Sequence, residues 1–158
     1  MKSILLISTG LALVVPLSAH AQTEAAFTAS KSAVQTYDLS ERCGLRAEKF
    51  FKDQFGREGA SHDANGSYIT NFRSHFNEHL NKCFILVSTD MYPTDRKERP
   101  NTQISLADVN ENRTYGEFFA YVQTQPTLTY RVMECRVRDE KCASKQDFDA
   151  ATDALMNQ

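Results

Sequence analysis

Two histidines and a glutamate form the most suggestive chemical pattern in the chain. The string from His75 to His79, with Glu78 inside it, has the H-x-x-E-H order of one class of zinc peptidase. In those enzymes the string lies on a helix, so that imidazoles four residues apart share a face and can hold one zinc ion. Here the residues before His75 alternate as in a strand, and His79 falls in a predicted hairpin connection. A small zinc-dependent hydrolase using His75, Glu78 and His79 is therefore the alternative hypothesis, and the main prediction has no catalytic residue, metal or cofactor.

A second string resembles the start of a calcium-binding loop. Asp108, Asn110 and Asn112 have the D-x-N-x-N spacing of such loops. A complete loop needs glycine at its sixth position and glutamate at its twelfth, where this chain has Arg113 and Phe119. Aspartate and asparagine are also the residues that form tight turns, so we predict a hairpin turn here.

All four cysteines follow the first 40 residues: Cys43, Cys83, Cys135 and Cys142. An even number of cysteines in a small exported protein favours disulfide bonds over free thiols. A zinc site would favour C-x-x-C pairs, and the sequence has none. Four cysteines allow three connectivities, and we favour Cys43–Cys83 together with the short local pair Cys135–Cys142.

The elements that position these residues begin with a predicted hairpin. Tyr68, Phe72 and Phe76 recur every four residues, so on a strand they share one face. The continuous apolar run 83–87 is typical of a strand that is buried on both faces. The polar residues 77–81 between the two segments suit a hairpin connection.

Further along the chain, alternating patterns predict three more strands over residues 102–109, 114–122 and 128–137. Two helices flank the strands. The first starts at Asp38 and stops at Gly56, and the second has Ser144 as its N-cap residue and Phe148 in its apolar stripe. The predicted fold is α+β, an antiparallel meander of about five strands with an N-terminal and a C-terminal helix packed on one face.

Aromatic residues occur on both predicted faces of the strand 114–122. Tyr115, Phe119 and Tyr121 alternate onto one face, and Phe118 points to the other. An antiparallel sheet covered by helices on one side can leave its second face open. Tyr115, Phe119 and Tyr121 are therefore the candidate binding residues of an exposed face.

The N-terminus resembles an export signal. Residues 1–21 combine Lys2, an apolar stretch that is too short to span a bilayer, and the cleavage pattern Ala19-His20-Ala21. Residues 22–37 are then a loose lead-in, and residues 38–158 form a single α+β domain. The formal net charge of −2 argues against nucleic acid as the main ligand, and no later segment suits a membrane span.

Residues 80–85 (LNKCFI), 108–112 (DVNEN) and 115–116 (YG) together resemble a group of small exported proteins of Gram-negative bacteria. The resemblance runs from about Cys43 to the final helix and implies a location in the periplasm or outside the cell, with no activity or catalytic residue. The resulting hypothesis is an exported, disulfide-stabilised binding or inhibitor-type module. It is non-enzymatic and has a protein partner in the envelope or outside the cell.

Overall fold

The computed structural model describes residues 19–56, 59–95, 97–123 and 127–157, with side chains from residue 33 onward. The chain divides into two compact units, Met1–Gln35 and Thr36–Gln158. The sheet and every contact discussed below belong to the second unit. The predicted signal peptide, residues 1–21, lies almost wholly outside the described residues.

The N-terminal helix α1 spans Ala19–Phe55 and so begins well before the predicted start at Asp38. The segment 22–37, predicted as a loose lead-in, is helical. Alanine is frequent in this segment and is the best helix former, and no glycine or proline interrupts the chain between residue 19 and Gly44. The predicted stop is confirmed, because Gly56 follows the helix with a φ of 81° and its amide donates to the carbonyl of Lys52.

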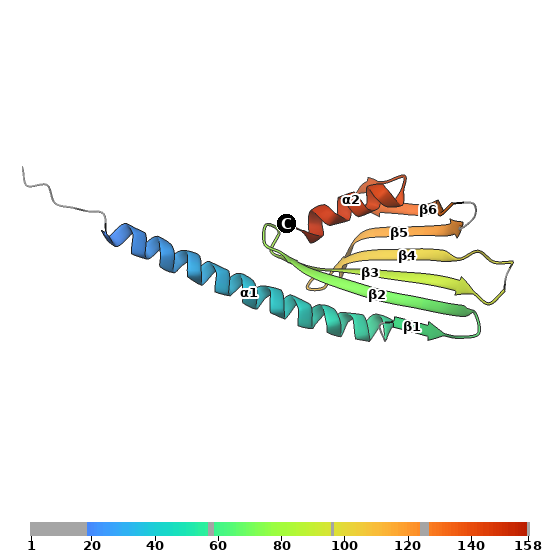
Figure 1. The fold of residues 1–158 in the computed structure, drawn as a ribbon, viewed down its shortest axis with the longest axis horizontal. Helices are drawn as coiled ribbons and strands as arrows, with labels where there is room; N and C mark the ends of the chain where they lie inside the picture. Colours follow the sequence, from blue (N-terminus) through green and yellow to red (C-terminus); the bar gives the residue numbers. More distant parts are fainter. Residues whose placement is uncertain (1–18, 57–58, 96, 124–126, 158) are drawn as a thin grey trace, which may run out of the picture. The chain divides into compact units, whose positions relative to one another are not determined.

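Seven antiparallel strands form one sheet in sequence order, as Figure 1 shows for most of them. They are β1 (Gly59–His62), β2 (Gly66–Asn77), β3 (Lys82–Pro93), β4 (Asn101–Asp108), β5 (Arg113–Gln123), β6 (Thr129–Val137) and β7 (Glu140–Lys141). The α+β class and the antiparallel meander are confirmed. The two added strands, β1 and β7, are short edge strands made of mostly exposed residues, and this explains why they carry no apolar alternation.

The C-terminal helix α2 spans Lys145–Met156 and begins as predicted. The hydroxyl of Ser144 accepts a hydrogen bond from the amide of Asp147 and thereby caps the first turn. Phe148, Thr152 and Leu155 are buried along one side of the helix. The helical spacing of the sequence therefore identified the side of α2 that faces the sheet.

The two helices pack on opposite faces of the sheet, so the prediction that both cover one face is wrong. Phe84 of β3 belongs to the cluster that contains Phe148 of α2, and its neighbour Ile85 belongs to the cluster that contains Phe51 of α1. Successive side chains of a strand point to opposite faces. We call these the α2 face and the α1 face. The run of buried residues in β3 places apolar side chains on both faces of the sheet. Each face therefore needs a helix packed against it, and helices on one face alone cannot bury both sets of side chains.

Among the described residues, none of the helices has the length and apolar character that crossing a membrane requires.

Candidate binding surface

Only part of the α1 face is covered by α1. The helix packs through Ala47 and Phe51 against Ile85 and Val87 of β3 and Ala107 of β4. Beyond this contact, the strand register aligns residues of β4, β5 and β6 in three rows. The rows lie on the α1 face, because Ser105 of β4 is paired with Val87 of β3, which packs against α1. The rows are Asn101–Tyr121–Arg131, Gln103–Phe119–Glu134 and Ser105–Glu117–Arg136. We call these residues the open face.

An aromatic pair lies at the centre of the open face. The rings of Phe119 and Tyr121 meet edge to face with their centroids 5.4 Å apart. Both side chains are half-buried, whereas Gln103, Arg131 and Glu134 beside them are exposed. Such a pair offers a large apolar contact area together with the hydroxyl group of Tyr121.

Charged residues surround the aromatic pair. Arg136 donates two hydrogen bonds to Glu117, at 3.2 and 2.7 Å, and its Nε lies 3.7 Å from Glu134. The hydrogen bonds to Glu117 raise the pKa of Arg136 above its ordinary value. At the other end, a cavity of about 500 Å³ lies beside Tyr121 and includes Arg99 and Arg131 in its lining. The open face is thus apolar at its centre and charged at its edges.

Tyr115 does not lie on the open face. The register of β4 and β5 shifts between Leu106 and Ala107, and this irregularity interrupts the alternation next to Tyr115. The ring of Tyr115 packs edge to face on Phe84, with centroids 5.2 Å apart, and joins the cluster of the α2 face. Of the three aromatic candidates, the structure brings Phe119 and Tyr121 together and places Tyr115 apart from them.

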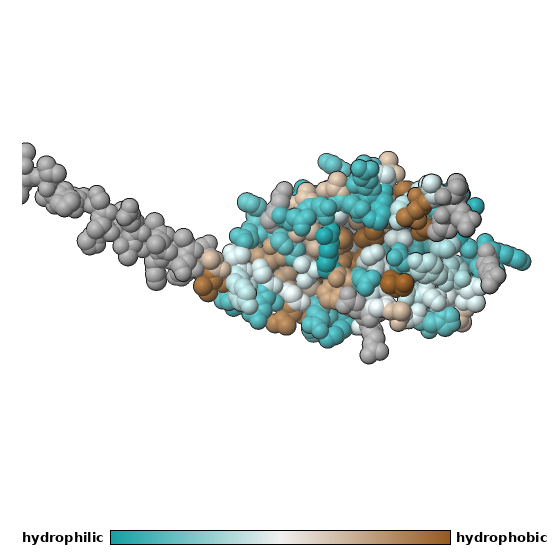
Figure 2. All heavy atoms as spheres, in the orientation of Figure 1, coloured by the Kyte–Doolittle hydropathy of each residue, from teal (hydrophilic) through white to brown (hydrophobic). Residues whose placement is uncertain are grey.

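Exposed apolar side chains elsewhere in the second unit are spread over different elements. They include Tyr37 and Leu45 of α1, Tyr92 of β3 and Met133 of β6. Figure 2 shows hydrophilic side chains over much of the visible surface, with smaller hydrophobic patches between them. Single exposed apolar residues are normal on soluble proteins and indicate no site by themselves.

The calcium-like string forms the predicted turn. Asp108 is almost fully buried and accepts hydrogen bonds from Lys82 and from the amide of Asn110, both at 2.9 Å. Asn112 has a φ of 50°, which asparagine tolerates in turns. Lys82 also bonds Glu111, and the hydrogen bonds to Glu111 and Asp108 raise the pKa of Lys82. Asp108 therefore anchors the β4–β5 turn to the start of β3.

The histidine string lacks the helical geometry of a zinc peptidase. His75 is a half-buried residue of β2, and Glu78 and His79 are exposed in the turn before β3. Across the part of the chain that the structure describes, no group of three or more His, Cys, Asp or Glu residues is placed to hold a metal ion. Asn77 within the string is buried, accepts from the amide of Leu80 and donates to the carbonyl of Leu155. No pattern in the sequence indicated that Asn77 connects this turn to α2.

Both preferred disulfides are present. Cys43–Cys83 joins α1 to β3, and Cys135–Cys142 closes the β6–β7 hairpin against the start of α2. All four cysteines are paired, so no thiol is left as a nucleophile.

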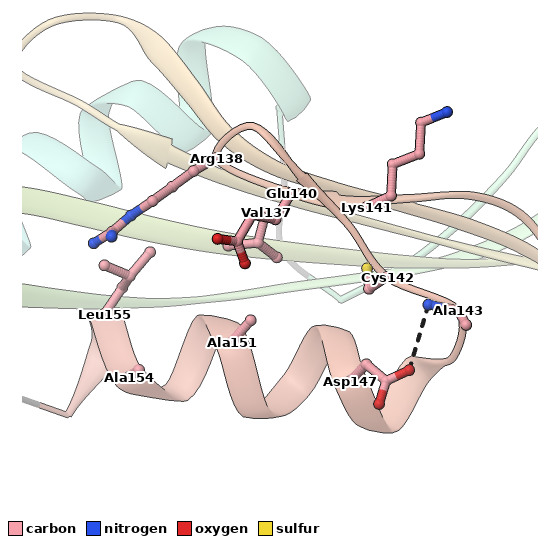
Figure 3. A pocket seen from close by; sticks show the side chains of 10 residues that line it. All are labelled: Val137, Arg138, Glu140, Lys141, Cys142, Ala143, Asp147, Ala151, Ala154 and Leu155. Carbon is pink, nitrogen blue, oxygen red and sulfur yellow. Dashed lines mark hydrogen bonds between the residues drawn. The ribbon is translucent and has the colours of Figure 1, made fainter.

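A cavity of about 610 Å³ lies between the β6–β7 hairpin and α2. Its lining mixes both signs of charge, from Arg138, Glu140, Lys141 and Asp147. Figure 3 shows Lys141 pointing away from the helix and Asp147 bonded to the amide of Ala143. The carboxylate of Asp147 therefore belongs to the cap of α2, and the cavity has no uniform chemical character that would select a ligand.

Comparison with protein-family models, curated proteins and solved structures finds no match to this chain.

Proposed function

We propose that the protein is an exported binding module whose open face contacts a protein partner. The observation that carries this proposal is the aromatic pair Phe119–Tyr121, which lies beyond the cover of α1 and within a frame of charged residues. An inhibitor of an envelope or extracellular hydrolase is one concrete version of such a module.

The composition of the open face supports a protein partner. Protein interfaces are enriched in tyrosine, phenylalanine and arginine, with an apolar centre and a polar rim. Phe119 and Tyr121 would form the centre, and Arg131, Glu134 and Arg136 would form the rim. Since the rim carries both signs of charge, we expect it to set the orientation of the partner more than the affinity.

The scaffold and the N-terminus support an extracytoplasmic location. Disulfide bonds persist in oxidising compartments such as the periplasm or the outside medium. Both disulfides join elements of the second unit, so they would keep the open face rigid before binding. A rigid surface loses less conformational entropy on association.

The test is affinity capture with the purified, oxidised protein from an extract of envelope and secreted proteins, followed by surface plasmon resonance with the captured partner. We expect Phe119→Ala and Tyr121→Ala each to weaken binding by about 30-fold, the effect of a residue at the centre of an interface.

Tyr92→Ala is the matched control, since Tyr92 is an exposed aromatic residue of β3 on the other face of the sheet. It should leave the affinity within about twofold of the wild type. A partner that binds all three variants equally would reject the open face as the contact surface. Capture of no partner above a blank matrix would reject the proposal as a whole.

A further inference from the structure

A small cavity at the other end of the α1 face has a chemical character of its own. It lies where α1 meets the β2–β3 and β4–β5 turns, and its volume is about 200 Å³. Its inner wall contains the buried disulfide Cys43–Cys83 and Phe76. Because the disulfide fixes α1 to β3, the cavity is held by covalent structure as well as by packing.

The charges that line this cavity have one sign. Its ionisable residues are Arg42 and Arg46, which lie one helical turn apart on α1, and Asn81 and Asn110 enter from the two turns. The other cavities described above and the two beside Leu128 each include at least one carboxylate in their lining. The cavity under Arg42 and Arg46 has none.

The polar groups of the cavity present hydrogen-bond donors. Arg46 uses one N–H group to donate to the Oδ1 of Asn110, at 2.6 Å. This bond occupies the acceptor of Asn110 and leaves its NH₂ group as a donor. Among the described residues, neither Arg42 nor Arg46 has a carboxylate within ion-pair distance. Each guanidinium carries five N–H donors, and among the described residues only Asn110 accepts a side-chain hydrogen bond from either arginine.

We propose that this cavity binds an oxyanion, the phosphate or carboxylate group of a small molecule. Guanidinium groups match both anions through paired N–H donors, and this match is stronger than a neutral hydrogen bond. The volume lies below the range of about 300–1,000 Å³ that is usual for drug-sized ligands, so the cavity suits a single charged group. The site is separate from the open face and does not depend on the function proposed for it.

The test is titration of the full oxidised protein with inorganic phosphate and, separately, with acetate. Binding is followed by isothermal titration calorimetry and by NMR shifts of the amides of Asn81 and Asn110, at constant ionic strength set with chloride. We expect saturable binding of at least one anion, and the tighter of the two identifies the ligand class. Arg42→Gln and Arg46→Gln should each weaken binding at least about tenfold, the loss expected for one charge-assisted hydrogen bond.

Lys49→Gln is the matched control, because Lys49 lies on α1 outside the cavity and its loss changes the net charge equally. It should change the affinity less than twofold. Arg42 makes no ion pair with a described residue, so its substitution tests the site even where Arg46→Gln weakens the fold. Absence of saturable binding of both anions, or equal loss in Lys49→Gln and Arg42→Gln, would overturn the proposal.

Discussion

The two faces of the sheet are covered in different ways. On the α2 face, one continuous cluster joins Phe84, Leu106 and Phe118 to Phe148 and Leu155 of α2. On the α1 face, the buried residues fall into two smaller clusters, one around Phe51 and one around the disulfide Cys43–Cys83. The α2 face contains the main core, and the α1 face combines a smaller contact, a disulfide and an uncovered area.

This difference indicates how one small sheet can be stable and still keep part of its surface uncovered. Stability requires apolar area that is removed from water, and the α2 face supplies most of it. A disulfide stabilises a fold without requiring a large apolar contact, since it acts mainly on the unfolded chain. The link between Cys43 and Cys83 therefore lets α1 stay in place with a small contact and leaves the open face uncovered.

The largest expected difference is between two neighbouring phenylalanines of β5. Phe118 is fully buried on the α2 face, and Phe119 is half-buried on the open face. We expect Phe118→Ala to lower the free energy of unfolding by about 3–5 kcal/mol, because it leaves a cavity in the core. Phe119→Ala should cost about 1 kcal/mol, mainly its edge-to-face contact with Tyr121.

Urea unfolding followed by circular dichroism measures both values. Similar losses for Phe118→Ala and Phe119→Ala would mean that the open face is part of the core, and the contrast between the two faces would then be wrong.

The second contrast is between the two disulfides. Their cysteines are separated by 40 residues for Cys43–Cys83 and by 7 for Cys135–Cys142. From loop-closure entropy, replacing both cysteines of the longer link by alanine should cost about 4 kcal/mol, and of the shorter link about 2 kcal/mol. The longer link also fixes α1, so its loss should increase amide exchange along α1 while α2 stays protected.

Hydrogen exchange and thermal melting of the two double variants test this order. A greater loss of stability without Cys135–Cys142 would show that the β6–β7 hairpin and α2 depend on a covalent link more than α1 does.

The sequence predicted the features that depend on local patterns. Period-two alternation and the continuous apolar run around Phe84 predicted the strands β2 to β6. Ser144 as N-cap residue predicted the start of α2. The disulfide pairing followed from the compartment and from the preference for a short local loop between Cys135 and Cys142. Apart from the pair Cys43–Cys83, which spans 40 residues, these signals lie within a few residues of one another.

The features that sequence reasoning missed depend on long-range contacts. Cys83 and Phe84 are adjacent in β3, so their side chains point to opposite faces of the sheet. The disulfide of Cys83 holds α1 on one face, and Phe84 packs in the cluster of α2 on the other. No periodicity within either helix specifies this choice. The register shift beside Ala107 moved Tyr115 away from Phe119, because one irregular position changes the face of the residues next to it. Arg42 and Arg46 had no recognised pattern, since the other polar residues of their cavity, Asn81 and Asn110, lie in two distant turns.

The smallest expected effect tests how closely α1 approaches the sheet. Gly44 follows Cys43 on α1, and a Cβ atom placed at Gly44 meets nothing within 4 Å. Gly44→Ala should therefore stabilise the protein by about 0.5–1 kcal/mol, since alanine is the better helix former. Gly66→Ala is the contrasting variant, because a Cβ atom at residue 66 would lie 2.4 Å from the carbonyl oxygen of Tyr92. We expect this substitution to destabilise β2.

Chemical unfolding of the two glycine variants gives the comparison. A lower stability of Gly44→Ala would mean that α1 packs closely on the sheet only because residue 44 has no side chain. Close packing would then hold α1 on the sheet, as it holds α2. A stabilised one would support the view that Cys43–Cys83, rather than close packing along the helix, sets the position of α1. The uncovered area of the α1 face would then follow from how its helix is attached.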